Sequence, residues 1–570
     1  IMSIFSKVAA KVPKSSVFNL SHESKLSCNI GDLIPILCQE VLPSDKFKIS
    51  TELLVKLAPL KAPMMHKIKA YVHYFFVPTY QINTVFQDFI NPRVNVDNSV
   101  ILPFCYPSQI KDYGQIGGTS GGLTGSLADY LGLPIYQNSY MSQFGESTTK
   151  TAHLLIDPFR VYQHIYNEYY RDQNLEFNSG SVTDPLFDIE KFRNLSGPVG
   201  LEMSPNQLIN LLKIRKRAWA KDYFTSALPS PQAGDDVLIP LSGEVVADGN
   251  FALGGSFGTA QGELDYLDQL NMGLESYDVD SGNFGVDFNV DGVSTGSDTM
   301  GSTQLTYKSG LKTINGTATI NDLRRAMALQ RFKELAERGG TRYSEMVRNF
   351  FGAFLKDYWV DRPIFLGGMS KNITVSEVIQ QSASTDVLID TESATAYLGE
   401  RGGIANAYGK TKTVSFTSPC HGYIMGILSL RPEAVYHQGV ERMWWRHSLF
   451  DWAFPQFARM GEQEINNVEI FASGDPDYDE GVFGYTPRYA EYKVGHSHIA
   501  GEFRRSLNYW TMSRFFTQAP TLSKEFVQMS KINYEPFAIT DPSVEHCYVD
   551  LYNKIIARRP LPYFGSPSVI

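Results

Sequence analysis

The sequence has no long hydrophobic run and only five cysteines. No stretch of about 18 apolar residues occurs, and the N-terminus lacks the apolar segment of a secretion signal, so we expect neither membrane insertion nor a signal peptide. The cysteines, at positions 28, 38, 105, 420 and 547, are far apart and form no CxxC pair. This pattern is typical of reduced, buried thiols in a protein made in the cytosol rather than of a disulfide framework or a zinc site.

Charged side chains are also scarce, and positive charge is missing from one long segment. Only 19% of residues are charged, and no Lys or Arg occurs between Tyr223 and Tyr307. This segment carries thirteen glycines and thirteen acidic residues, which leaves 47 acidic against 51 basic residues elsewhere, a balance of about +4. We interpret it as an acidic, glycine-rich insertion turned to solvent, attached to a mildly basic body that is able to face a polyanion.

Hydrophobic periodicity predicts many short strands and a few helices. Apolar and alternating runs predict strands within 16–22, 32–41, 47–49, 69–78, 375–378, 414–416, 423–430, 489–494 and 509–512. Amphipathic spacing and capping residues predict helices at 157–169, 204–219, 321–338 and 341–354. Strands separated by long, aromatic-rich connections indicate an elaborated antiparallel β-sandwich.

The most aromatic stretch follows the strand at 423–430, which ends at Pro432. We predict a subunit interface formed by eight of its residues, Arg442, Trp444, Trp445, Arg446, Phe450, Trp452, Phe454 and Phe457. Aromatic residues with arginine and without lysine are typical of interface cores. Each large ring buries roughly 150–250 Å², so this segment must pack on something substantial. A domain core with paired arginines is the alternative.

A second cluster is basic. Lys213, Arg215, Lys216, Arg217 and Lys221 surround Trp219, with only Asp222 nearby. Cations beside a stacking aromatic are typical of a surface that contacts phosphates. The alternative is the solvated face of a helix.

Motifs for catalysis and for metal binding are poor. The pattern GxSxG occurs three times, at Ser120, Ser256 and Ser294, but none has both the strand and the helix that a nucleophile elbow requires. His496 and His498 have no third ligand at a diagnostic spacing. We expect no cofactor and no enzymatic activity. Weak Ca²⁺ binding by the clustered carboxylates of the insertion is left open.

Several blocks of the sequence match a known family in order along nearly the whole chain. They include SVFNLSH at 16–22, HYFFVP at 73–78, DYFTSALP at 222–229, the segment 323–343 with its RGGTRY ending, and the segments 33–35, 40–45, 362–368, 437–444, 461–463, 482–485 and 488–492. These blocks resemble the major capsid proteins of microviruses, in particular those of the gokushovirus branch.

The resemblance implies an eight-stranded antiparallel viral jelly roll, a β-sandwich with long loop insertions and several short helices. Sixty copies would form a T=1 virion shell around circular single-stranded DNA, assembled in the cytoplasm of a bacterial host. The family's further partners would be an internal scaffolding protein, a pilot protein, a small basic DNA-binding protein and a host receptor. The basic cluster Lys213 to Lys221 would then face the DNA.

The resemblance also implies a domain organisation. We expect a basic N-terminal arm at 1–30, a first part of the jelly roll at 31–226, an acidic insertion at 227–320 and a second part of the jelly roll at 321–570. In the family the insertion builds a protrusion at the threefold axis. Its candidate host-contact residues are Asp265, Asp278, Asp280, Asp287 and Asp291.

Two other classes remain open from the residues alone. A carbohydrate-active β-sandwich enzyme would use paired carboxylates, but the acids here cluster in an insertion where preorganisation is difficult. A lectin-like adhesin would use that same insertion as its binding loop.

Overall fold

A computed structural model describes residues 15–90, 101–107, 109–110, 124–134, 153–176, 189–198, 203–234, 237, 320–340, 342–357, 361–379 and 401–564. The chain divides into two units, one formed by residues 1–235 and 332–570 and the other by residues 236–331. In the second unit the described residues are 237 and the beginning of helix α9 (Ile320–Gly339). The rest of the predicted insertion lies outside the described residues, with the exception of 227–234.

Residues 227–234 belong to the first unit, although the prediction assigned them to the insertion. Leu228 is buried, and its backbone exchanges two hydrogen bonds with that of Tyr485, of 2.8 and 2.9 Å. Likewise, residues 16–28 of the predicted N-terminal arm form two strands of a sheet. Backbone pairing therefore extends the body at both of these borders.

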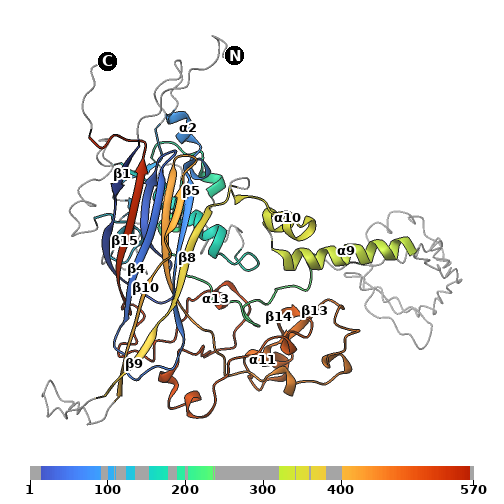
Figure 1. Ribbon diagram of the computed structural model, residues 1–570. Coiled ribbons are helices and arrows are strands. Elements are labelled where there is room, and N and C mark those ends of the chain that lie inside the picture. Colours follow the sequence, from blue (N-terminus) through green and yellow to red (C-terminus); the bar gives the residue numbers. More distant parts are fainter. Residues whose placement is uncertain are drawn as a thin grey trace, which may run out of the picture. The chain divides into compact units, whose positions relative to one another are not determined.

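Two antiparallel sheets form a β-sandwich in the first unit (Figure 1). The larger sheet has the order β1 (Ser16–Asn19), β15 (Cys547–Arg559), β4 (Lys46–Leu57), β10 (Arg401–Lys410) and β9 (Thr374–Ile379), with β11 (Val414–Thr417) beside β4 and β2 (His22–Cys28) beside β15. The smaller sheet has the order β3 (Ile34–Val41), β12 (Gly422–Pro432), β5 (Ile68–Pro78) and β8 (Ile364–Asn372). The larger sheet has seven strands and the smaller sheet four, and the predicted mainly β class, an antiparallel jelly-roll sandwich, is confirmed.

Strand β15 shows why these residues form a sheet. Its side chains alternate between the interior and solvent, with Val549, Leu551 and Ile555 buried and Tyr548 and Tyr552 exposed. A period of two places every second side chain on the same face. The strand pairs with β4 without interruption from Cys547 opposite Leu57 to Arg558 opposite Lys46. The strands predicted from the sequence do not include β15, β8 or β10.

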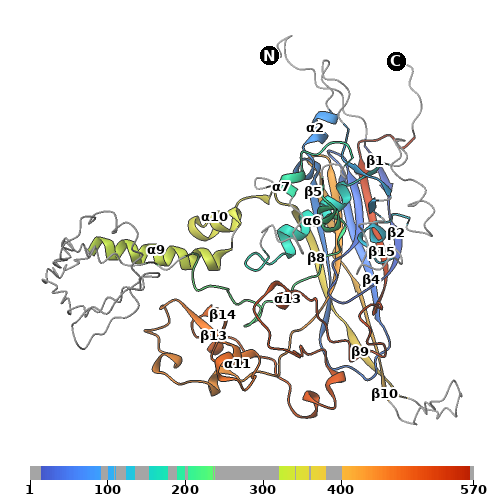
Figure 2. The same ribbon diagram turned by 180° about the vertical axis from the view of Figure 1, so that it is seen from behind.

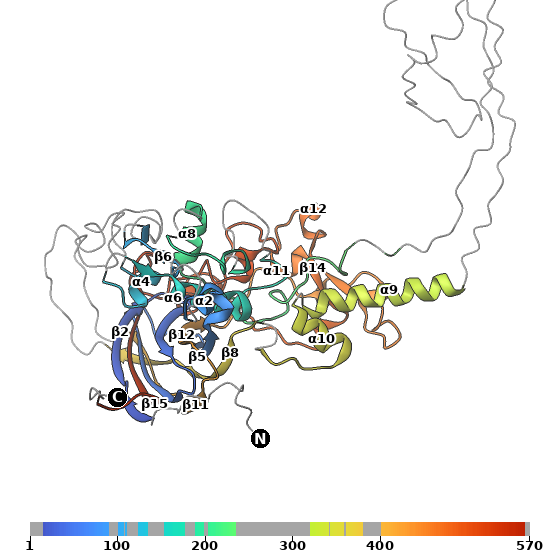
Figure 3. The same ribbon diagram turned by 90° about the horizontal axis from the view of Figure 1, so that it is seen from above.

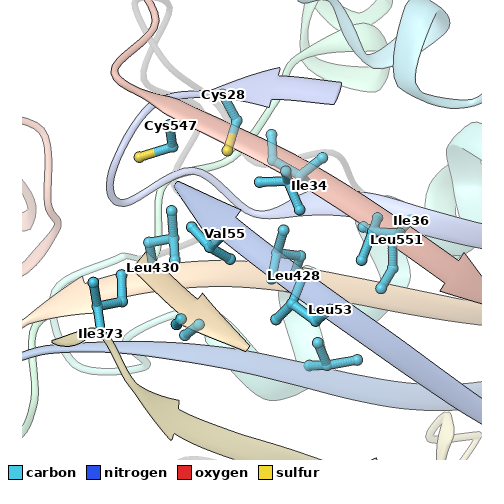
Figure 4. Packing of buried hydrophobic residues seen from close by; sticks show 14 of the residues in the cluster. Cys28, Ile34, Ile36, Leu53, Val55, Ile373, Leu428, Leu430, Cys547 and Leu551 are labelled. Carbon is cyan, nitrogen blue, oxygen red and sulfur yellow. The ribbon is translucent and has the colours of Figure 1, made fainter. Parts of the chain in front are cut away.

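The core of the sandwich takes side chains from both sheets (Figure 4). Leu53 and Leu551 of the larger sheet and Leu428 of the smaller one are all buried in it. Cys28 and Cys547 are register partners on β2 and β15, and both are buried free thiols. All five cysteines are free thiols; Cys105 is also buried, whereas Cys38 and Cys420 are half-buried.

Helices cover the outer face of the smaller sheet (Figures 2 and 3). Helix α6 (Asp157–Ile165) has Pro158 in its first turn and packs Phe159 and Tyr162 against Phe75 and Met425 of the sheet. It continues into a π-helical turn at Tyr166–Tyr170. Helix α8 (Pro205–Leu212) begins with a capping box between Ser204 and Gln207, and it adds buried leucines to the same cluster.

A third hydrophobic cluster surrounds a small hairpin of strands β13 (Glu462–Asn466) and β14 (Val482–Pro487). The remaining short elements are α1 (Thr79–Ile82), α2 (Val85–Ile90), β6 (Phe104–Cys105), α4 (Leu127–Tyr130), β7 (Leu154–Leu155), α7 (Ile189–Phe192), α10 (Tyr343–Phe351), α11 (Asn467–Ile470), α12 (Pro476–Asp479), η10 (Gly501–Arg504) and α13 (Lys524–Val527). None of the helices in the described part of the chain is long and apolar enough to cross a membrane.

Four predicted elements differ from the structure. The expected strands at 489–494 and 509–512 are instead 3₁₀ turns, η9 (Ala490–Tyr492) and η11 (Asn508–Trp510). Tyr489 has a left-handed backbone with φ of 59°, which a regular strand does not allow. The helix at 341–354 ends at Phe351, because Gly352 adopts the left-handed conformation of a helix C-terminus. The helix expected at 204–219 ends at Leu212.

The sandwich core gives a first prediction. Leu551→Ala removes a fully buried side chain from β15 and leaves a cavity, so the free energy of unfolding should fall by about 2–5 kcal/mol. Chemical denaturation followed by circular dichroism measures this loss. Leu561→Ala is the matched control, because Leu561 is exposed and its truncation should change the stability by less than about 0.5 kcal/mol. Equal losses in the two variants would contradict the assignment of this core.

Candidate subunit interface

The aromatic segment leaves the smaller sheet after β12 and covers residues 433–460, named here the aromatic arm. It contains two 3₁₀ turns, η7 (Arg442–Trp444) and η8 (Leu449–Asp451), and no strand or longer helix. Four of its large rings are exposed: 74% of Trp444, 55% of Trp452, 49% of Phe450 and 40% of Phe454 are accessible to solvent. Trp445 and Phe457 are half-buried. The arm is therefore not the core of its own subunit, and this alternative is excluded for the isolated chain.

Arg442 attaches the arm to the β13–β14 hairpin. Its guanidinium donates to the backbone oxygen of Glu464 at 2.6 Å and to the carboxylate of Glu469 at 3.1 Å, and it lies 3.5 Å from Asp451. Burial by itself would lower the pKa of Arg442, but the surrounding carboxylates, led by Glu469, raise it above its usual value. The guanidinium thus stays charged. It links turn η7, which contains Arg442, to turn η8 through Asp451 and to the hairpin through Glu464.

Asp451 organises the second turn. Its carboxylate accepts hydrogen bonds from the backbone of His447 at 3.1 Å and from the backbone and hydroxyl of Ser448 at 2.8 and 2.9 Å. Burial raises the pKa of Asp451, but these hydrogen bonds and the charge of Arg442 outweigh it and hold the pKa below its usual range. The exposed rings are consequently carried on a fixed backbone.

The rings of the arm also contact one another. Phe457 packs against Phe450 and Phe454, with ring centroids 5.1 and 5.9 Å apart. The guanidinium of Arg446 lies over the rings of Trp452 and Tyr492, at 5.0 and 4.6 Å from their centroids. Cation–π contacts of this kind orient exposed rings without burying them. The result is an exposed aromatic surface that includes an arginine, a composition typical of interface anchors.

A recess of about 720 Å³ lies beside the arm. Its lining includes Met443, Trp444 and Arg446 of the arm and, from other segments of the first unit, Tyr223 and His496. A protruding ring next to a recess is a shape that a second protein surface can complement.

The basic cluster does not form one exposed face, which corrects the prediction. Residues 213–219 are extended rather than helical, with isolated bridges from Lys216 to Asp32 and from Ala218 to Gln528. In an extended segment alternate side chains point to opposite sides. Arg215, Arg217 and Trp219 point inward and are 3%, 9% and 3% exposed.

Both inward arginines of this cluster have an internal hydrogen-bond partner. Arg215 donates from its Nε to Gln163 at 2.8 Å, and Arg217 donates to the hydroxyl of Ser429 at 2.6 Å. Burial, followed by the charge of Arg431, lowers the pKa of Arg217 to about 10. These two arginines hold the segment against the helical layer and the sheet, and they are not placed to contact a nucleic acid.

The remaining cations of the cluster are only partly available. Lys216 forms an ion pair of 2.5 Å with Asp32, and Lys221 pairs with Asp172. Lys213 is exposed directly after α8. From 213 to 219 a basic or aromatic side chain occupies every second position, a pattern that predicts an extended segment and could have revealed the buried positions. The Ser-Pro pair at 204–205 favoured a helix over the whole range instead.

The acidic candidates of the insertion, Asp265, Asp278, Asp280, Asp287 and Asp291, lie outside the described residues. Their predicted role at a host-contact surface stays a prediction. Among the residues that the structure does describe, no group of three or more His, Cys, Asp or Glu is arranged to hold a metal ion.

The low pKa of Asp451 gives a prediction about the arm. A depressed folded-state pKa stabilises the folded arrangement above the unfolded value of about 3.9, and this stabilisation is lost as the pH falls through the folded value. Asp451→Asn should therefore accelerate proteolytic cleavage within 440–460 at neutral pH, and the difference from the unchanged protein should shrink toward pH 3. Limited proteolysis followed by mass spectrometry measures the rate of cleavage in both proteins. The control variant Asp477→Asn changes an exposed carboxylate of α12 and should be cleaved at the same rate as the unchanged chain at every pH.

Comparisons with known proteins agree with an interface-forming protein. The model of the family "Capsid protein (F protein)" matches residues 6–569. Capsid protein VP1 of Chlamydia phage 1 is 31% identical over 99% of this chain and 97% of its own length. VP1 of Bdellovibrio phage phiMH2K is 30% identical over 99% and 97%, and VP1 of Spiroplasma virus 4 is 28% identical over 98% and 96%. The chain therefore belongs to the capsid protein (F protein) family, that of the microvirus major capsid proteins, and is a structural component of a virion rather than an enzyme.

Proposed function

We propose that sixty copies of this capsid protein close into a T=1 icosahedral shell that encloses a circular single-stranded DNA genome and takes part in host attachment. The observation that carries the proposal is the exposed aromatic arm, whose backbone is held by Arg442 and Asp451. A surface with four large rings at 40–74% exposure is unfavourable in an isolated subunit and favourable between copies.

Symmetry explains how such arms are used. A patch on one copy that contacts a different patch on the next forms a ring when the rotation closes, and a closed shell leaves no unmatched patch. Each copy makes several contacts at once, so individually modest contacts suffice. Trp444, Phe450, Trp452 and Phe454 are the candidate anchors, and Arg442 with Asp451 fixes their backbone.

The proposal includes partners because the charge of the body is small. Outside the acidic segment the chain carries about four positive charges in excess, which cannot neutralise a packed genome. A small basic DNA-binding protein supplies the remaining positive charge. An internal scaffolding protein and a pilot protein complete the assembly, in the virion of a phage whose shell is made in the bacterial cytoplasm.

The acidic insertion is the proposed host-contact surface, through an unknown receptor. Its support is compositional: thirteen acidic residues and no Lys or Arg between Tyr223 and Tyr307. Its carboxylates are also the place where weak Ca²⁺ binding is proposed, since oxygen ligands are what this ion requires. Infection assays with and without a chelator test both roles.

Trp444→Ser tests the interface. Removal of a central aromatic anchor should weaken each contact by about 2 kcal/mol or more, so the concentration needed for assembly should rise by about 30-fold or more. Analytical ultracentrifugation and negative-stain microscopy should show subunits or small rings in place of closed shells. Circular dichroism should show an unchanged subunit fold, because the side chain is mostly exposed before assembly.

Two controls accompany this variant. Trp444→Phe keeps a large ring and should restore most of the assembly. Met65→Ser removes an equally exposed apolar side chain far along the sequence from the arm and should leave assembly intact. If Trp444→Ser forms normal shells, Trp444 is not part of the interface. If the unchanged protein forms no shells together with its partners, the proposed function is refuted.

A further inference from the structure

The outward face of the larger sheet carries an uneven distribution of charge. Its strands β2, β4, β10 and β15 direct seven cations and three acids to solvent, a balance of +4, from Lys25, Lys46, Lys48, Lys56, Lys410, Lys554, Arg558, Glu23, Glu52 and Asp550. Two of the acids are already neutralised on this face: Glu52 pairs with Lys410 at 2.7 Å, and Glu23 pairs with Lys25. The positive excess is therefore concentrated elsewhere on the sheet.

Four cations gather at the end of the sheet where β15 leaves β4. Lys46 and Arg558 are directly opposite each other in the register. Lys48 is two positions from Lys46 on β4, and Lys554 is four positions from Arg558 on β15, diagonally across from Lys48. All four are exposed, and none forms an ion pair with any residue that the structure describes. We name this set the cationic patch. Arg558 also donates from its Nε to the hydroxyl of Ser15 at 2.7 Å.

The cationic patch is unfavourable for the isolated sheet. Like charges directly opposite each other on antiparallel strands destabilise the pairing. The register itself is fixed by the buried residues between them, because a shift by one residue would turn Phe47 and Ile555 to solvent. The fold thus holds four cations together that repel one another, and an anionic ligand relieves this repulsion.

Two features favour a single-stranded polynucleotide over a small anion. Exposed tyrosines continue the patch along the same face, with Tyr552 two residues from Lys554 and Tyr408 on β10 opposite Leu54 of β4. Bases of a single strand stack on such rings while cations follow the backbone. In addition, Ser15 is preceded by fourteen residues that contain Lys7, Lys11 and Lys14 and no acid. This basic segment is attached to the chain at the position that Arg558 binds.

We propose that the cationic patch binds the phosphates of single-stranded DNA, and that the outward face of the larger sheet is consequently the face of the subunit that meets the genome. This inference rests on the proposed function, since it assigns the DNA contact of the proposed shell to particular residues. It replaces the basic cluster around Arg215 and Arg217, whose side chains are internal.

The test uses the full chain and a single-stranded oligonucleotide of 30 nucleotides. Lys46→Gln, Lys48→Gln and Lys554→Gln are combined in one variant, and binding is followed by fluorescence anisotropy over a range of salt concentrations. Each lost phosphate contact lowers the slope of log K against log salt concentration by about 0.7, so the triple variant should lose about 2 in slope. Without DNA its melting temperature should stay equal or rise, because repulsion within the sheet is relieved.

The control variant removes the same charge elsewhere. Lys61→Gln, Lys67→Gln and Lys531→Gln change three exposed lysines that pair with Glu535, Glu433 and Glu525, and the salt slope should stay close to that of the unchanged chain. A loss of slope in the control equal to that in the patch variant, or an unchanged slope in the patch variant, would overturn the proposal.

Assembled particles separate this inference from the proposed function. In cells that supply the other phage proteins, the patch variant should form shells with less DNA, as measured by absorbance at 260 and 280 nm. Shells of the patch variant with the full DNA content would refute DNA binding by the cationic patch and leave the proposed capsid function intact. Failure of the unchanged chain to form shells would instead refute the proposed function.

Discussion

The pairing of β15 with β4 is the constraint on which the rest of the structure depends. It joins a C-terminal strand to one near the N-terminus over an unbroken register from Cys547 to Arg558. One face of this pair supplies Leu53, Leu551 and Ile555 to the core, and the other face exposes lysines and tyrosines. Because the core residues alternate with the exposed ones, the interior packing fixes the position of every cation on the outside.

The same logic applies to the aromatic arm, which begins where β12 ends. Strand β12 is held between β3 and β5 and is buried on both faces, so its end at Pro432 is a fixed point. From there Arg442 and Asp451 use charge and backbone hydrogen bonds, rather than burial, to hold the arm. Exposed side chains contribute little to the stability of their own subunit, so the arrangement of the arm depends on these polar contacts.

Two surfaces of the subunit thus carry groups that are unfavourable in isolation. The arm exposes rings that water solvates poorly, and the cationic patch gathers like charges. Both are held in place by parts of the structure that are well packed, namely the hairpin of β13 and β14 and the sandwich core. A subunit whose exposed surfaces are satisfied only by other molecules is consistent with membership of a capsid protein family.

The sequence by itself determined the mainly β class, the strand at 423–430, the helix starts at Asp157 and Ser204, and the aromatic composition of the arm, because these depend on local patterns of apolar residues, caps and prolines. Only the tertiary structure decided which strands pair, since β15 and β4 are hundreds of residues apart and local patterns do not specify partners. It also decided which charges are available. Arg217 and Lys46 look alike in the sequence, but one stacks on Tyr71 inside the subunit, and the other faces solvent opposite Arg558 because the register of the sheet places it there.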